Sequence, residues 1–124
     1  MRFLIVEDGE DYVENLLWQL KTLGFEDVEV CSYGSEEGNQ RMPSLRYIGD
    51  RVKEADIILL DHELSADYDG EDVFHQCCHG KIVISTSGSS ASYRYATRHI
   101  DTKRLYRKRP EVLGQAISEA LAKP

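Results

Sequence analysis

Short apolar runs that alternate with amphipathic segments constrain this chain more than any other feature. The runs predict strands over residues 3–6, 28–32, 57–60, 82–84 and 105–106. Apolar residues at helical spacing predict helices over residues 10–23, 43–54, 73–79, 90–99 and 110–121. Continuous apolar strands that alternate with helices are typical of a parallel sheet covered on both faces. We therefore predict an α/β fold of five β–α units.

Length and charge limit the class of protein. The 124 residues are enough for a single domain over 1–124. Lys and Arg number 15 against 22 Asp and Glu, and the net charge of −7 disfavours non-specific nucleic-acid binding. The aliphatic run 57–60 is far shorter than the roughly 20 residues that span a bilayer, so we expect no membrane contact. With three cysteines and an acidic N-terminus that does not fit a signal peptide, we expect a cytoplasmic protein.

Charged and hydroxyl side chains follow four of the predicted strands. They are Glu7 and Asp8, Asp61, Thr86 and Ser87, and Lys108 and Arg109. The carboxyl ends of parallel strands meet at one edge of the sheet, where such folds bind ligands. Three carboxylates at one edge repel one another, and a hard cation such as Mg²⁺ offsets this repulsion. A carboxylate beside such a metal can act as a nucleophile towards phosphorus, while a lysine and a hydroxyl bind the phosphoryl oxygens.

This arrangement resembles the receiver domain of two-component response regulators, in particular stand-alone receivers of the chemotaxis-regulator type. Residues 3–8, 57–61, 82–87 and 105–108 carry the resemblance, which extends from Phe3 to about Leu121. It implies a flavodoxin-like, doubly wound parallel sheet of five strands in the order 2-1-3-4-5, with helices on both faces. The implied function is that of a phosphoacceptor signalling domain in a phosphorelay.

The resemblance also implies a phosphoacceptor and a cofactor. Asp61 would accept a phosphoryl group from a phosphohistidine on a sensor histidine kinase or a histidine phosphotransfer protein. The cofactor would be Mg²⁺, held by Glu7, Asp8, Asp61 and the backbone carbonyl of Glu63. The chain would not be a conventional enzyme, because its only reactions would be its own phosphorylation and its own dephosphorylation.

Further roles follow from the same resemblance. Thr86 would bind the phosphoryl group and, with Tyr106, would switch the face of the fourth helix, fifth strand and last helix towards a downstream protein target. Lys108 would pair with the phosphoryl group. The family has Lys-Pro after the fifth strand, whereas here Arg109 stands between Lys108 and Pro110, so Arg109 is an alternative for the lysine's role. We favour Lys108, because an ammonium and a guanidinium are not interchangeable.

Two other interpretations of the whole chain stay open. The loop after Asp61 lacks the family's usual proline and is one residue longer before Gly70, which keeps a phosphorylation-independent pseudo-receiver as one alternative. A metal-dependent phosphatase is the other, with His62 as the nearby candidate for a general acid.

Three local patterns are weaker. Acids at 61, 63, 69 and 72 have the spacing of a calcium loop, but Ala66 stands where that loop needs glycine. The stretch of histidines and cysteines at 75–79 lacks the second ligand pair of a zinc site. The basic run over 94–109 has no DNA-binding motif beside it, so we interpret it as a face for a protein partner.

Overall fold

The computed structural model describes residues 1–88, 94–100 and 109–122. In chain order its elements are β1 (Phe3–Val6), α1 (Glu10–Thr22), β2 (Val28–Cys31), α2 (Leu45–Glu54), β3 (Ile57–Leu60), α3 (Gly70–Cys77), β4 (Ile82–Ser85), β5 (Arg98–His99) and α5 (Pro110–Ala122). Among these helices none is both long enough and apolar enough to cross a membrane.

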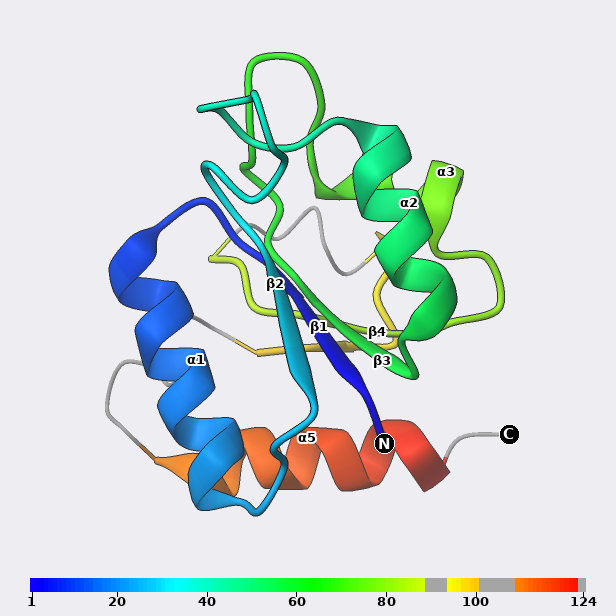
Figure 1. The fold of residues 1–124 in the computed structure, drawn as a ribbon. Helices are drawn as coiled ribbons and strands as arrows, with labels where there is room; N and C mark the ends of the chain where they lie inside the picture. Colours follow the sequence, from blue (N-terminus) through cyan, green and yellow to red (C-terminus); the bar gives the residue numbers. More distant parts are fainter. Residues whose placement is uncertain (89–93, 101–108, 123–124) are drawn as a thin grey trace.

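The strands form one parallel sheet at the centre of the molecule (Figure 1). The order β2-β1-β3-β4 agrees with the predicted order 2-1-3-4, and the two-residue β5 pairs with the outer side of β4. The register aligns Val6 of β1 with Leu60 of β3, and Leu60 with Ser85 of β4. Three neighbouring strands therefore end at the same level, as the prediction of a common edge requires.

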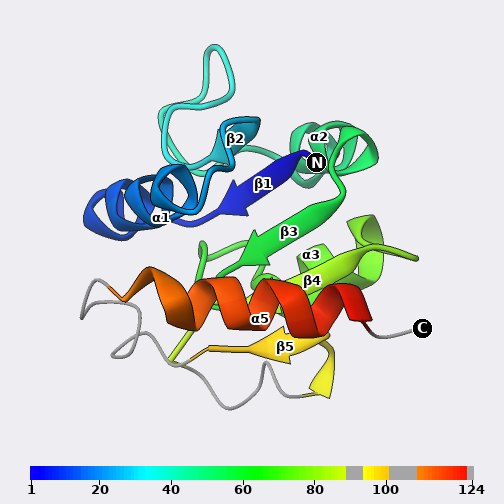
Figure 2. The same cartoon turned by 90° about the horizontal axis from the view of Figure 1, so that it is seen from below.

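The apolar strands are buried on both faces, because helices cover the sheet on each side. Leu4 and Val6 point into a core with α2 and α3, whereas Phe3 and Ile5 point into a second core with α1 and α5. Figure 2 shows α1 and α5 on one side of the sheet and α2 and α3 on the other. This arrangement explains why β1 and β3 are uninterrupted apolar runs rather than alternating ones.

Besides α3, which spans Gly70–Cys77 rather than residues 73–79, two predicted helices differ from the structure. Helix α2 begins at Leu45 rather than at Pro43, because the Ser44 side chain accepts a hydrogen bond from the Tyr47 backbone and caps the helix. The predicted helix over 90–99 is wrong for residues 94–99, which contain no α-helix and end in β5.

Backbone pairing explains this second difference. The amide of Thr97 donates to the carbonyl of Val83, and the amide of Ile100 donates to the carbonyl of Ser85, so the segment follows β4 instead of coiling. The strand predicted at Leu105 and Tyr106 lies outside the described residues.

Candidate functional site

The backbone ladder continues one residue beyond the strands and sets the site residues side by side. The amide of Asp61 donates to the carbonyl of Val6 at 3.0 Å. The amide of Thr86 donates to the carbonyl of Leu60 at 3.1 Å. Glu7, Asp61 and Thr86 therefore follow three adjacent strands at one edge of the sheet.

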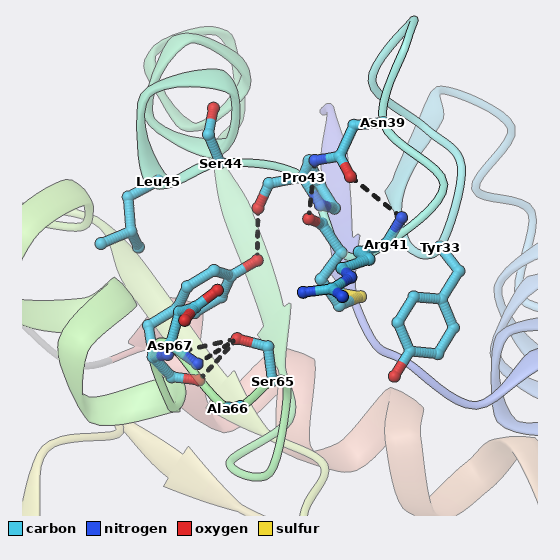
Figure 3. Close-up of a pocket in the computed structure, with 11 residues that line it drawn as sticks. Tyr33, Asn39, Arg41, Pro43, Ser44, Leu45, Ser65, Ala66 and Asp67 are labelled. Carbon is cyan, nitrogen blue, oxygen red and sulfur yellow. Dashed lines mark hydrogen bonds between the residues drawn. The ribbon is translucent and has the colours of Figure 1, made fainter.

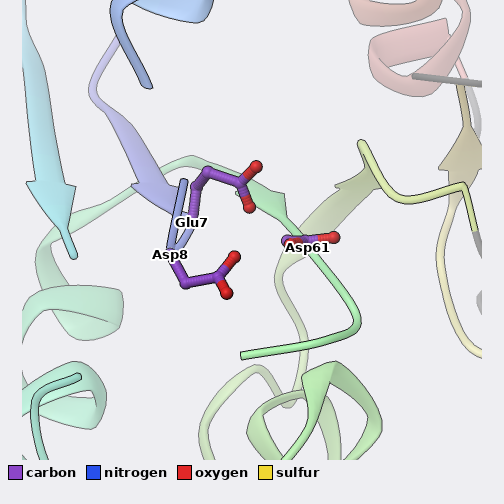
Figure 4. Close-up of side chains that lie close together, drawn as sticks. All are labelled: Glu7, Asp8 and Asp61. Atoms are coloured by element: carbon purple, nitrogen blue, oxygen red, sulfur yellow. The ribbon is translucent and has the colours of Figure 1, made fainter. Parts of the chain in front are cut away.

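Glu7, Asp8 and Asp61 form a compact group of carboxylates, which we call the acidic edge. Figure 4 shows Glu7 and Asp8 after β1 and Asp61 after β3, with their side chains gathered in one place. One carboxylate oxygen from each lies within 4.8 Å of the others. Glu7 is only 3% exposed, whereas Asp8 and Asp61 are half-buried. Oxygen ligands at this spacing fit a hard divalent cation.

Without a cation, burial and neighbouring negative charges oppose the ionisation of Glu7 and Asp8 at the acidic edge. Burial, followed by the hydrogen bond and the charge of Asp61, raises the pKa of Glu7 to about 10. Burial and the charge of Asp61 also raise the pKa of Asp8, and Glu63 adds a smaller effect of the same sign. Like charges and burial both oppose ionisation of a carboxyl group. A bound cation would reverse this effect, because it favours the ionised carboxylates.

Two buried oxygens at this edge have no hydrogen-bond partner in the part of the chain that the structure describes. Within the described residues, Oε2 of Glu7 and Oγ1 of Thr86 are buried and accept or donate no hydrogen bond. An unsatisfied buried oxygen is costly for the folded chain unless something binds it. The donor set therefore fits Mg²⁺ at Glu7, Asp8 and Asp61, and an oxyanion at Thr86. The fit follows from the carboxylate oxygens of the acidic edge and the hydroxyl oxygen of Thr86.

The structure describes only some of the remaining predicted site residues. Glu63 lies in the loop after Asp61 and lines a shallow hollow together with Asp8. Lys108 and Tyr106 lie outside the described residues. Arg109 is exposed and directly precedes α5, and among the described residues it forms no ion pair.

The calcium-loop spacing has another explanation in the structure. The side chain of Asp69 accepts from the amide of Asp72, and the side chain of Asp72 accepts from the amide of Asp69. These two acids form a capping box that starts α3. Among the described residues, the acidic edge is the one group of three or more candidate metal ligands.

A recess opens beside the acidic edge, between the β2–α2 loop and the β3–α3 loop. Its volume is about 660 Å³, and Arg41 points into the space between Tyr33 and Ser65 (Figure 3). Hydrogen bonds fasten its walls, including one from the Tyr68 hydroxyl to the carbonyl of Pro43. Tyr33, Ser65 and Ala66 also line the hollow that reaches Asp8. A molecule bound at the acidic edge would therefore have a preformed recess next to it.

The sequence-based interpretation did not identify Tyr95 as part of this region. Its hydroxyl is hydrogen-bonded to Nδ1 of His62, the residue after Asp61, at 2.9 Å. The sequence predicts that Tyr95 lies on a helix, and no residue spacing in it indicates a contact between residues 33 positions apart. His62 was noticed only as a possible general acid, a role that its engagement with Tyr95 does not favour.

Comparison with known proteins gives a match by fold. No protein-family model matches the sequence, and no curated protein matches it. The structure is similar to the BeF₃-activated receiver domain of DrrB, with a TM-score of 0.67 and 15% identity over 98% of this chain and 97% of that one.

A second similar structure has a similar score. It is the N-terminal domain of a response regulator/sensory box/GGDEF three-domain protein from Carboxydothermus hydrogenoformans. Its TM-score is also 0.67, with 19% identity over 98% of this chain and 94% of that one. The chain therefore has the fold of response-regulator receiver domains.

Proposed function

We propose that this chain is a phosphoacceptor signalling domain in which Asp61 receives a phosphoryl group in the presence of Mg²⁺. The observation that carries the proposal is the acidic edge. Three carboxylates lie within 4.8 Å, and the buried Oγ1 of Thr86 on the next strand has no partner among the described residues. The receiver fold supports the same proposal.

The chemistry is a direct transfer to a carboxylate. An oxygen of Asp61 attacks phosphorus, and the bond between phosphorus and the donor's imidazole nitrogen breaks. The imidazole keeps the electron pair and takes up a proton. Mg²⁺, when bound, neutralises charge on the carboxylates and on the phosphoryl oxygens. Glu7, Asp8, Asp61 and the backbone carbonyl of Glu63 would hold that cation, and the Thr86 hydroxyl would donate to a phosphoryl oxygen. Lys108, with Arg109 as the alternative, pairs with the remaining charge.

The partners follow from this chemistry. The donor is a phosphohistidine on a sensor histidine kinase or a histidine phosphotransfer protein, which docks over the acidic edge and the recess that contains Arg41. The output is a protein contact on the β5–α5 face, where Arg98 of β5 is paired with Glu119 of α5 at 3.1 Å. Three free cysteines agree with a cytoplasmic setting.

Intact-protein mass spectrometry tests the proposal. The protein is incubated with Mg²⁺ and phosphoramidate, and the expected product is heavier by about 80 Da, the mass of one phosphoryl group. Asp61→Asn should abolish this product. Asp67→Asn is the matched control, because Asp67 is an exposed acid of the same loop, and it should be phosphorylated like the wild type.

Two results would contradict the proposal. One is that the wild-type protein gains no phosphoryl group and binds no Mg²⁺, which is the behaviour of a pseudo-receiver. The other is that Asp61→Asn gains the group at the wild-type rate, which would exclude Asp61 as the acceptor.

A further inference from the structure

A hydrogen-bonded contact between two loops lies next to the backbone of Asp61. His62 directly follows Asp61, and Tyr95 lies between β4 and β5. The Nδ1 atom of His62 and the Tyr95 hydroxyl are 2.9 Å apart, and the two rings stack with centroids at 6.1 Å and an interplanar angle of 26°. Tyr95 is 8% exposed and the His62 side chain 14%, so solvent competes little for this hydrogen bond.

Both partners are held from other sides as well. The Tyr95 ring packs against Phe74 of α3, with centroids 5.3 Å apart. The Nε2 atom of His62 lies 3.8 Å from a carboxylate oxygen of Asp69, the residue that caps α3. The imidazole is therefore hydrogen-bonded at Nδ1, and the Asp69 carboxylate lies near Nε2. The pair joins three segments: the loop after β3, the start of α3 and the segment before β5.

The backbone of His62 connects this pair to the Asp61 carboxylate. The amide of His62 donates to Oδ1 of Asp61 at 2.8 Å. The carbonyl of His62 accepts from the amide of Gly70 at 2.7 Å. This amide holds one oxygen of Asp61 and so helps to set the orientation of the carboxylate. Any movement of the His62 backbone changes the orientation of the Asp61 carboxylate.

Gly70 marks how closely these groups approach. A Cβ atom at position 70 would overlap the carbonyl of Asp61, the Cα atom of His62 and the hydroxyl of Tyr95. Glycine is the residue that permits such an approach. The backbone carbonyl of Asp61 and the hydroxyl of Tyr95 thus both lie against Gly70, the first residue of α3.

We infer that His62 and Tyr95 are positioning residues that orient the Asp61 carboxylate and couple it to the segment 94–100. This inference rests on the proposed phosphoacceptor function. A phosphoryl group on Asp61 shifts the carboxylate, and the His62 amide bonded to Oδ1 shifts with it. The imidazole carries that shift to Tyr95 and hence to the residues that form β5. The expected consequence is a change in segment 94–100 that depends on the Tyr95 hydroxyl.

The test uses variants that remove the hydrogen bond from either side. Tyr95→Phe removes the hydroxyl but keeps the ring, and His62→Ala removes its partner. His62→Asn is the rescue variant, because its amide oxygen can occupy nearly the position of Nδ1. Tyr47→Phe is the matched control, because it removes a tyrosine hydroxyl that donates to the carbonyl of Ser35 at 2.9 Å, outside the acidic edge and the recess. The readouts are the rate of phosphoryl uptake from phosphoramidate and the amide hydrogen exchange of residues 62–70 and 94–100.

We expect Tyr95→Phe and His62→Ala each to slow phosphoryl uptake by about three- to tenfold, the effect of one lost hydrogen bond. Their double variant should be no slower than His62→Ala alone, because both substitutions remove the same hydrogen bond. His62→Asn should restore most of the rate, and Tyr47→Phe should match the wild type. In the wild type, phosphorylation should change exchange across 94–100, and in Tyr95→Phe this change should be lost.

The outcomes separate the two proposals. A Tyr95→Phe variant with the wild-type rate and the wild-type exchange response would overturn the positioning role while leaving the phosphoacceptor function intact. Additive losses in the double variant would also overturn it. If the wild-type protein accepts no phosphoryl group, the proposed function fails and the coupling fails with it. Exchange in the unphosphorylated protein then reports separately whether Tyr95→Phe loosens residues 62–70.

Discussion

Two groups of acids lie close together in this chain and differ in how they are satisfied. At the start of α3, Asp69 and Asp72 accept hydrogen bonds from each other's amides at 2.9 Å. Glu71 pairs with Arg94 at 2.9 Å and lies 3.6 Å from His75. These acids have partners in the chain itself, and negative charge at a helix N-terminus is favourable.

The acidic edge has the opposite character. Glu7 is almost fully buried, its Oε2 atom has no partner among the described residues, and its pKa is raised far above the usual value. Asp8 shows the same direction of shift. The number of acidic residues does not distinguish the two groups, whereas their hydrogen-bond partners do. The unsatisfied group is the one that an external cation would stabilise, whereas the satisfied group caps α3.

The largest expected difference between the two groups is in Mg²⁺ binding. Asp8→Asn removes the negative charge of a candidate ligand, so it should weaken Mg²⁺ binding by at least roughly 10-fold, the smallest cost of losing a group that only supports a ligand. Asp72→Asn removes a charge of the same kind but keeps an oxygen for the capping box, and its affinity should equal that of the wild type. Isothermal titration calorimetry measures both. Equal weakening by the two variants would mean that the cation responds only to overall charge.

The next largest effect is expected in the stability of the chain, at the residue that lies between the two groups. Gly70 begins α3 and touches the backbone of Asp61, so Gly70→Ala should lower the free energy of unfolding by about 1–3 kcal/mol through overpacking. Gly49→Ala is the matched control, because a methyl group there would meet only Sγ of Cys77 at 3.6 Å. Inside α2 the same change should raise stability by up to about 1 kcal/mol. Urea denaturation of the two variants should therefore give opposite signs.

Much of this arrangement could be predicted from the sequence, because it depends on the order of apolar and polar residues. The buried runs of β1 and β3 identified the strands, and parallel pairing then required their ends to meet. For that reason the sequence alone predicts that Glu7, Asp8 and Asp61 lie together, and the structure brings them together.

Other features depend on contacts that leave no local pattern. The strand β5 consists of Arg98 and His99, which carry no apolar signal, and it exists because the backbone beside them bonds to β4. The start of α2 depended on whether Ser44 or Pro43 set the boundary, which only the cap geometry shows. The contact between His62 and Tyr95 joins two loops, and no periodicity predicts it.

The pH dependence of stability should identify the unsatisfied group. Burial, together with Asp61, raises the pKa of Glu7 from 4.5 to about 10, so the folded chain keeps a proton that the unfolded chain loses. Between these values the folded state binds more protons, and the free energy of unfolding therefore falls as the pH rises. Glu7→Gln should remove this contribution and raise stability at pH 7 by at least about 1 kcal/mol.

Denaturation in the presence of a chelator, between about pH 5 and about pH 9, measures this effect. The stability of the wild type should decline relative to that of Glu7→Gln across the whole range. Saturating Mg²⁺ should reduce the decline in the wild type, because the cation favours the ionised carboxylate. Parallel curves for the two proteins without metal would contradict the raised pKa.

The smallest expected effect comes from the satisfied group and has the opposite sign. Asp69→Ala removes the side chain that accepts from the amide of Asp72, so it should lower the free energy of unfolding by about 0.5–2 kcal/mol. Asp69→Asn keeps an oxygen acceptor and should lose less. Neutralising an acid thus stabilises the metal-free chain at Glu7 and destabilises it at Asp69. If both substitutions destabilise the chain by similar amounts, Glu7 is satisfied in the folded state, and the acidic edge needs no cation.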